Sequence, residues 1–274
     1  MSGIRAPQRA RRYRNTLSTA HTGRVTTDSS PASRVVAVAG GKGGVGKSTV
    51  TLNLALVLAG RSRRVGILDA DLYGPDIPAM LGLTRTENAR RWTLWRSDGV
   101  RLEPIERRGL KIMSAGFLLG ERQTMPWQSP TLPFVLRQLL YGVSWGELDY
   151  LLVDLPPGTA DLQAGLFREV RLDGALIVVG PQDVAHLDAK KVVTLLRDAD
   201  VPLLGAVENM AGLLCPHCGE PIELFPPVAA ERSLWHDGVR RLVSIPLDPA
   251  LGELNGGPPP VFDALADELE RVLA

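Results

Sequence analysis

The feature that most constrains this chain is a glycine-rich segment between an apolar run and a helical pattern. It matches the P-loop pattern G-x-x-x-x-G-K-[ST], with Gly41 and Gly46 as the glycines, followed by Lys47 and Ser48. The preceding residues, 35–39, are apolar on both faces, as in a strand buried inside a parallel sheet. Apolar residues recur at helical spacing after the motif. Strand, loop and helix therefore follow in the order that a phosphate-binding loop requires.

Glycines let successive backbone N–H groups approach phosphate oxygens closely, because they carry no side chain and tolerate unusual dihedral angles. We expect Lys47 to reach the terminal phosphates and the Ser48 hydroxyl to bind Mg²⁺. The alternative, a glycine-rich turn that binds nothing, is disfavoured by the strand and helix on either side. The predicted nucleotide-binding residues here are Gly41, Gly43, Gly44, Val45, Gly46, Lys47, Ser48 and Thr49.

Lys42 makes the motif more specific. A lysine on a glycine loop could be a solvated charge, but the run from Lys42 to Ser48, K-G-G-V-G-K-S, resembles the deviant Walker A motif of the MinD/ParA class of ATPases. In that class the early lysine reaches across a dimer interface to the partner's nucleotide. The resemblance implies an ATP-dependent homodimer in which Lys42 is catalytic.

Composition is compatible with one large α/β domain. The chain has 274 residues, 45% of them hydrophobic, and a formal net charge of +1, which favours neither nucleic acid nor membrane as a partner. It contains no run of eighteen apolar residues and no apolar signal core after its basic N-terminus. We expect a soluble, cytoplasmic protein.

Residues 1–33 differ from the rest, with six arginines before the first acidic residue, Asp28, and few large apolar side chains. Such a segment is typical of a disordered, solvated tail. A mitochondrial transit peptide, which would place the protein in the matrix, and a nucleic-acid contact are the alternatives. The ATPase domain is predicted to span residues 34–274.

Strand and helix patterns alternate through that domain. This alternation predicts an α/β fold, a doubly wound, mainly parallel sheet with helices on both faces and its ligand at the carboxyl ends of the strands. A hairpin is expected within residues 92–106, around Ser97–Gly99. Predicted strands cover 35–39, 64–68, 111–113, 149–154, 175–179, 203–207 and 242–245; predicted helices after the one that follows the P-loop cover 131–143, 185–197 and 261–272.

Acidic residues end two of these strands. Asp154 is followed by Leu-Pro-Pro-Gly-Thr and suits the Walker B role of supporting Mg²⁺, with a strand-end cap as the alternative. Asp69 and Asp71 follow the strand at 64–68. Carboxylates beside a triphosphate need Mg²⁺ or an attacking water between them, so we expect Asp69 to orient water and Asp71 to position the metal site or loop. Two solvated loop acids are the alternative.

From residue 35 to about residue 260 the chain resembles the Mrp-type ATPases, iron–sulfur cluster carriers of the MinD/ParA class. Five ordered motifs carry the resemblance: residues 41–48, 68–75, 149–161, 181–185, and 207–210 leading to Cys215-Pro216-His217-Cys218. It implies that Asn209 contacts adenine, that a loop with Pro246 and Asp248 covers the base, and that apo iron–sulfur proteins are clients.

Cys215 and Cys218 are the only cysteines. Spaced C-x-x-C beside a nucleotide motif, they indicate a metal or redox pair of a reducing compartment. Tetrahedral iron or zinc sites usually take four ligands, so two copies must meet to complete one. The family resemblance implies a [4Fe–4S] cluster bridging two subunits; structural zinc and a redox pair are the alternatives.

The sequence departs from the family pattern at several positions outside these motifs. Gln128 and Ser129 replace an arginine and a glycine, Asp76 and Ala211 replace serines, and residues 224–228 replace a glycine-rich stretch. We expect no counterpart of the extra N-terminal domain that many members of the family carry. These changes spare the phosphate, magnesium and cysteine positions and bear on partner recognition.

The sequence therefore predicts a homodimeric ATPase that hydrolyses ATP slowly and carries an iron–sulfur cluster to apo-proteins. The alternative is a ParA/MinD-like positioning or regulatory ATPase with structural zinc at the cysteine pair. Its membrane-bound form is disfavoured because the C-terminal helix pattern carries Asp267, Glu268 and Glu270 beside its apolar face.

Overall fold

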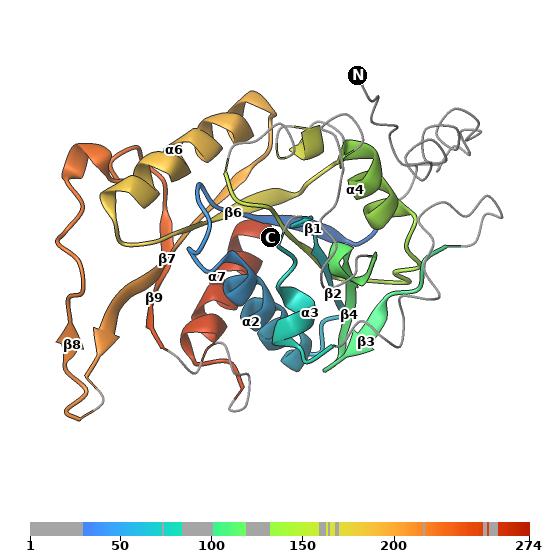
Figure 1. Ribbon diagram of the computed structural model, residues 1–274, viewed down its shortest axis with the longest axis horizontal. Coiled ribbons are helices and arrows are strands. Elements are labelled where there is room, and N and C mark those ends of the chain that lie inside the picture. The colour runs from blue at the N-terminus through green and yellow to red at the C-terminus, as the bar shows by residue number, and fades with distance from the viewer. Residues whose placement is uncertain are drawn as a thin grey trace, which may run out of the picture.

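The computed structural model describes residues 30–72, 74–83, 101–118, 132–158, 163, 165–167, 170–215, 217–248, 251 and 257–274. They form a nine-stranded sheet with helices packed against it (Figure 1). The strands are β1 (Arg34–Ala39), β2 (Val65–Asp69), β3 (Ile105–Arg107), β4 (Leu110–Ser114), β5 (Tyr150–Asp154), β6 (Gly174–Val179), β7 (Leu203–Leu214), β8 (Pro221–Ile222) and β9 (Arg241–Leu247). The helices are α2 (Lys47–Gly60), α3 (Ile77–Met80), α4 (Leu132–Tyr141), α6 (Asp183–Asp198) and α7 (Val261–Leu273).

The sheet has the strand order β3-β4-β2-β5-β1-β6-β7-β8, with β9 also paired to β7. All pairs between β4 and β7 are parallel, and so is the pair of β7 with β9. Antiparallel pairs occur at the two ends, between β3 and β4 and between β7 and β8. β1 lies inside the sheet, with β5, β2 and β4 on one side and β6 and β7 on the other, which confirms the predicted doubly wound, mainly parallel sheet.

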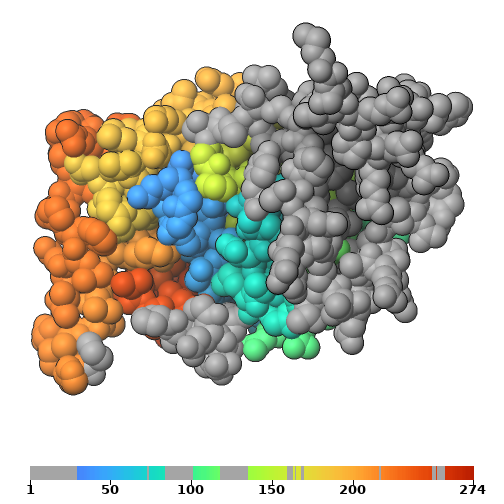
Figure 2. All heavy atoms as spheres, viewed as in Figure 1, coloured from blue at the N-terminus to red at the C-terminus, as the bar shows by residue number. Residues whose placement is uncertain are grey.

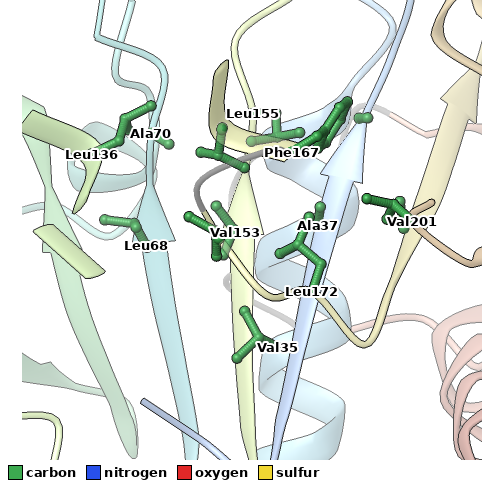
Figure 3. Close-up of a cluster of buried hydrophobic side chains, with 14 of the residues drawn as sticks. Val35, Ala37, Leu68, Ala70, Leu136, Val153, Leu155, Phe167, Leu172 and Val201 are labelled. Atoms are coloured by element: carbon green, nitrogen blue, oxygen red, sulfur yellow. The ribbon is translucent and has the colours of Figure 1, made fainter. Parts of the chain in front are cut away.

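Helices cover both faces of the sheet, and β1 shows how the sequence produces this. Val35 and Ala37 belong to the hydrophobic cluster that includes α4 and α6, whereas Val36 and Val38 belong to the one that includes α2 and α7. Figure 3 shows part of the first cluster, with side chains from β1, β2 and β5 on one side of the sheet. A strand buried on both faces must be apolar throughout, as the run 35–39 is.

The antiparallel hairpin that the structure describes, β3 and β4, lies slightly later in the chain than the predicted hairpin. The turn expected at Ser97–Gly99 lies outside the described residues. β3 reverses into β4 through Arg108 and Gly109, both with positive φ, so the strand predicted at 111–113 is the second half of this hairpin.

Two elements near the cysteines differ from the predicted ones. β7 continues to Leu214 rather than ending near Val207, with a register shift against β9 between Asn209 and Leu213. β8 has only two residues, too few for a recognisable sequence pattern. Together they form a hairpin that carries the Cys-x-x-Cys segment at its turn.

Residues 1–29 of the predicted tail lie outside the described part of the chain. Ala32 is buried in the core, and the Ser33 N–H donates to the Leu148 carbonyl over 3.0 Å. Ala32 and Ser33, which belong to the predicted tail, therefore already contact the domain. Within the described residues, no helix is long and apolar enough to cross a membrane.

The packing of α7 against α2 gives a stability prediction. Phe262 of α7 is fully buried in the same cluster as the apolar side chains of α2. Phe262→Ala should lower the free energy of unfolding by about 3–5 kcal/mol, because it leaves a cavity in a packed core. Urea unfolding measures this. The control is Val184→Ala, whose side chain is exposed on α6 and whose effect should stay within about 0.5 kcal/mol; equal effects of the two changes would contradict the packing described.

Candidate functional site

The P-loop connects the carboxyl end of β1 to the first residue of α2. Gly44 and Gly46 have φ values of 76° and 87°, in the left-handed region that favours glycine. A Cβ on Gly41 would lie 2.2 Å from the backbone carbonyl carbon of Asp188 in α6. The glycines are therefore needed both for the turns of the loop and for its close packing on α6. Figure 2 shows the blue segment that includes the loop at the surface, between the gold segment of α6 and the cyan segment after β2.

Asp154 lies directly beside the first turn of α2. Its carboxylate accepts hydrogen bonds from Ser48 Oγ at 2.5 Å and from Thr51 Oγ1 at 3.3 Å. Neighbouring strands bring them together, because β5 pairs with β1 and Asp154 is the register partner of Val38. In the structure, the carboxylate predicted for the Walker B role is therefore hydrogen-bonded to the hydroxyl predicted to bind magnesium.

The surroundings of Asp154 raise its pKa to about 6. Burial is the largest cause, and the charge of Asp71 adds to it, whereas the Ser48 hydrogen bond and the charge of Lys47 act in the opposite direction. A hydroxyl and a carboxylate side by side are the hard oxygen donors that Mg²⁺ takes together with phosphate oxygens. Ser48 and Asp154 therefore fit the ion that the motif implies.

Asp69 is also fully buried and is the register partner of Asp154 across β2 and β5. It accepts hydrogen bonds from Ser114 Oγ at 2.9 Å and from the Asp71 backbone N–H at 3.3 Å. Burial first, and the Asp154 carboxylate second, raise its pKa well above the ordinary value. The carboxyl groups of Asp69 and Asp154 thus meet at the edge where phosphates are expected, and the burial of Asp69 shows that it is not a solvated loop acid. Asp71, half-buried, lies beside them and accepts the Gly74 N–H at 3.2 Å.

The segment after β5 also touches the P-loop. Gly158, with φ of 90°, donates its backbone N–H to the Gly40 carbonyl at 3.2 Å. A Cβ on Gly43 would lie 4.0 Å from the Cβ of Pro157. The Pro-Pro-Gly turn therefore lies where a change at the terminal phosphate of a nucleotide could reach it.

The two lysines of the motif differ in environment. Lys47 is buried, whereas Lys42 is half-buried and the Lys42 ammonium makes neither an ion pair nor a hydrogen bond within the described residues. The arrangement is compatible with Lys47 acting within its own subunit and Lys42 acting elsewhere.

Asn209 packs against the P-loop from β7. Its Nδ2 donates to the Val45 carbonyl at 2.8 Å, and a Cβ on Gly46 would lie 2.2 Å from that nitrogen. The next residue, Met210, has φ of 59°, which strains a residue other than glycine. The predicted contact of Asn209 with adenine stays a prediction; in this structure its side chain supports the loop.

The predicted base-covering loop begins at the same sheet edge. Pro246 follows Ile245, which pairs with Asn209 across β7 and β9. The Asp248 carbonyl accepts the Leu251 N–H at 3.2 Å, and the Leu251 carbonyl accepts Nδ2 of Asn53 in α2 at 3.5 Å. The structure therefore brings this loop beside the helix that follows the P-loop.

Cys215 and Cys218 lie at the turn of the β7–β8 hairpin. The Cys215 N–H donates to the Glu220 carbonyl, and the Cys215 carbonyl accepts the Gly219 N–H, both at 2.9 Å. Backbone N–H groups of Cys218 and His217 lower the pKa of the Cys215 thiol, and the Cys218 thiol adds to this. Among the described residues no third His, Cys, Asp or Glu joins them in a metal-binding group, and His217 is exposed. One chain therefore offers two sulfur atoms as candidate metal ligands here.

Two side chains of the site were not predicted. Thr51 lies one helical turn after Ser48, and Ser114 ends β4 beside Asp69. Their position could have revealed them, since a hydroxyl one turn along the helix or at a strand end reaches the same edge. Hydroxyls are too frequent in sequences for that position alone to be decisive.

This loop, with its strand-end carboxylates on a doubly wound sheet, defines a P-loop NTPase. The profile of the family described as ParA, NUBPL iron-transfer P-loop NTPase, matches residues 32–272. The chain belongs to this family.

The names and identities of similar proteins confirm the resemblance to iron–sulfur cluster carriers. The chain is 44% identical to the "Iron-sulfur cluster carrier protein" of Pseudomonas fragi, over 84% of this chain and 79% of that one. It is 41% identical to the protein of that name from Escherichia coli K12, over 87% of this chain and 63% of that one. It is 39% identical to an Arabidopsis thaliana "Iron-sulfur protein required for NADH dehydrogenase, mitochondrial", over 80% and 68%.

Solved structures agree with the fold. A nucleotide-binding protein of Archaeoglobus fulgidus in complex with ADP has a TM-score of 0.67 and 37% identity, over 88% of this chain and 89% of that one. The cell division ATPase MinD of Pyrococcus furiosus has a TM-score of 0.61 and 25% identity, over 88% and 99%.

The buried carboxylates generate a pH prediction for the protein without nucleotide or metal. The raised pKa of Asp154 means that folding disfavours its charged form, so this cost is absent below about pH 4, grows as pH rises to about 6 and is complete above. Asp154→Asn should therefore raise the free energy of unfolding at pH 8 by on the order of 2 kcal/mol, and by little at pH 4.

Urea unfolding in EDTA at the two pH values measures this. The matched control is Glu103→Gln at an exposed carboxyl, which should change stability little at either pH. A gain for Asp154→Asn that is equal at both pH values would show that charge burial is not its cause.

Proposed function

We propose that the protein is an ATP-binding, slowly hydrolysing homodimer that carries a [4Fe–4S] cluster and transfers it to apo iron–sulfur proteins. The observation that carries the proposal is β7. Asn209, in the middle of this strand, contacts the P-loop, and the strand ends directly before Cys215. A single strand thus connects the proposed nucleotide site to the proposed cargo site. This arrangement suits a cluster carrier, and relatives of the chain are named iron–sulfur cluster carrier proteins.

The geometry supports the following roles for the residues of the site. The loop amides and Lys47 bind the phosphates, Ser48 with Asp154 supports Mg²⁺, and Asp69 is the proposed residue for orienting the attacking water. Lys42 is proposed to act in the nucleotide site of the other subunit. This is consistent with the finding that its ammonium forms neither an ion pair nor a hydrogen bond within the described residues. Mg²⁺ would supply charge neutralisation between the phosphates and these carboxylates.

The cluster is cargo, and the cysteine pair supports a shared site. Two sulfurs per subunit complete a four-sulfur set only when two subunits meet. The lowered pKa of Cys215 favours the thiolate, which is the form that binds iron. Acceptors are apo-proteins with their own cluster ligands. We propose a cytoplasmic location; the Arabidopsis relative is named as mitochondrial, and the Arg-rich residues 1–33 keep the matrix as the alternative.

Cysteine substitution tests the cargo site. Cys215→Ser or Cys218→Ser should abolish cluster binding after anaerobic reconstitution, while the nucleotide Kd changes less than about twofold, because the thiolates lie outside the phosphate site. Iron, sulfide and zinc analysis with thiolate-to-iron absorbance measures the first effect. The expected stoichiometry is one cluster per dimer. One cluster per monomer would contradict a bridging cluster and would require further ligands within one chain. Bound zinc without iron would instead favour the positioning or regulatory ATPase.

The two lysines test the dimeric active site. Lys47→Ala should abolish nucleotide binding, whereas Lys42→Ala should keep most binding and lose turnover, because its proposed target lies in the other subunit. Mixing the two variants forms heterodimers in which one site has an intact Lys47 and receives Lys42 from its partner. Turnover of the mixture above both parents is the expected result. Absence of such a gain, with subunit exchange verified by labelled protomers, would contradict action in trans.

A further inference from the structure

Thr51 carries a fully buried hydroxyl in the part of α2 that packs against the sheet. Its chain neighbours Val50 and Leu52 are fully buried as well, and both belong to the hydrophobic cluster on this side of the sheet. Burying a hydroxyl among apolar groups costs free energy unless the hydroxyl is hydrogen-bonded. The hydrogen-bond partners of Thr51 therefore indicate what a polar residue does at this position.

The Thr51 hydroxyl has two acceptors. Its Oγ1 lies 2.9 Å from the Lys47 carbonyl and 3.3 Å from Oδ1 of Asp154. The first contact is common in helices, where a threonine bonds the carbonyl four residues before it; Thr194 of α6 makes the same bond with the Lys190 carbonyl at 3.1 Å. The carboxylate contact is what distinguishes Thr51. Because a hydroxyl has one proton, the two acceptors compete for it, and a charged acceptor forms the stronger bond.

The two hydroxyls of α2 hold the two oxygens of one carboxylate. Ser48 Oγ donates to Oδ2 of Asp154 at 2.5 Å, and Thr51 Oγ1 lies next to Oδ1. Among the described residues, these two are the side chains that donate hydrogen bonds to this carboxylate. The torsion that rotates an aspartate carboxylate is soft, so a single hydrogen bond leaves the group free to turn. Two donors on different oxygens fix its plane.

A fixed carboxylate matters because of the ion that Ser48 and Asp154 fit. Mg²⁺ demands near-ideal octahedral geometry with oxygen ligands at about 2.0–2.1 Å, whereas Ca²⁺ accepts a more variable set. A carboxylate that turns in its pocket would present its oxygens to Mg²⁺ in the correct orientation for only part of the time. Holding it in one orientation before the ion arrives removes that cost from binding.

We propose that Thr51 is a positioning residue of the magnesium site, which holds Oδ1 of Asp154 so that Oδ2 stays directed at the Ser48 hydroxyl. The inference rests on the role that the proposed function gives to Ser48 and Asp154. It goes beyond that role because Thr51 is assigned no contact with phosphate or metal and acts through the carboxylate. The hydroxyl, and not the bulk of the side chain, is the part that matters.

Thr51→Val tests the inference, because valine keeps the shape of threonine and removes the hydroxyl. The measurement is binding of a fluorescent, non-hydrolysable ATP analogue to the full chain while Mg²⁺ is titrated. The Mg²⁺ concentration for half-maximal enhancement of binding should rise about tenfold, since a hydrogen bond to a charged group is lost. In EDTA the Kd should change less than about twofold, and the half-saturating Ca²⁺ concentration should change less than about threefold.

Three further variants separate positioning from packing. Thr51→Ser keeps the hydroxyl, so it should stay within about twofold of the wild type. Thr194→Val removes the equivalent helix hydroxyl far from any carboxylate contact and should change nothing. In an Asp154→Asn background, Thr51→Val should add little, because two changes that act through one group are not additive. In ATP hydrolysis, saturating Mg²⁺ should restore the kcat of Thr51→Val to near the wild-type value.

The outcomes distinguish the inference from the function on which it rests. A wild-type response to Mg²⁺ that Thr51→Val shares in full would overturn the inference alone. So would an equal loss of affinity in EDTA and in Mg²⁺, which would indicate a damaged P-loop, or a Thr51→Ser variant as weak as Thr51→Val, which would indicate packing by the methyl group. Nucleotide binding that ignores Mg²⁺ in the wild type would overturn both the inference and the metal role of Ser48 and Asp154.

Discussion

The common carboxyl edge of β1, β2 and β5 is the constraint on which the rest of the site depends. Parallel pairing in register places the end of β1, Asp69 and Asp154 side by side, and the P-loop begins at that same edge. Such an edge concentrates carboxylates in a buried place, which raises their pKa values and costs stability. A fold retains that cost where cations and phosphates are to be bound, because those ligands convert the repulsion into attraction.

β7 adds a second constraint, because it contacts the P-loop through Asn209 and then leads directly into the cysteine hairpin. Asn209 supports the P-loop, and its close approach requires glycine at position 46. The strand then departs from regular pairing: Met210 takes a positive φ, Gly212 has φ of 139°, and the register with β9 shifts before Leu213. An irregular segment between two regular ones can change conformation without breaking the sheet. Residues 210–212 are the direct chain connection between the P-loop contact of Asn209 and the cysteine hairpin.

Patterns with a strong physical cause were predictable from the sequence. Strands buried on both faces are apolar throughout, so β1, β5 and β6 were found within one or two residues, and the P-loop glycines predicted the turns at Gly44 and Gly46. Features that depend on tertiary contacts were not predictable. The extension of β7 depends on pairing with β9 and β8, and the contact of Asn209 with Val45 joins segments far apart in the chain. The local spacing of apolar residues in the sequence predicts neither the extension of β7 nor this contact.

The position of the cysteines at the turn of a projecting hairpin suits the cargo site that we propose for them. Thiolates in the apolar core would have raised pKa values and would be closed to an acceptor. At the hairpin turn, backbone N–H groups lower the pKa of Cys215 while solvent and partners keep access. The same exposure leaves apolar side chains such as Ile222 and Phe225 in water, where they gain nothing for folding. Burial of these side chains against another protein chain would stabilise only the complex with that chain, in which the two chains meet beside the cysteines.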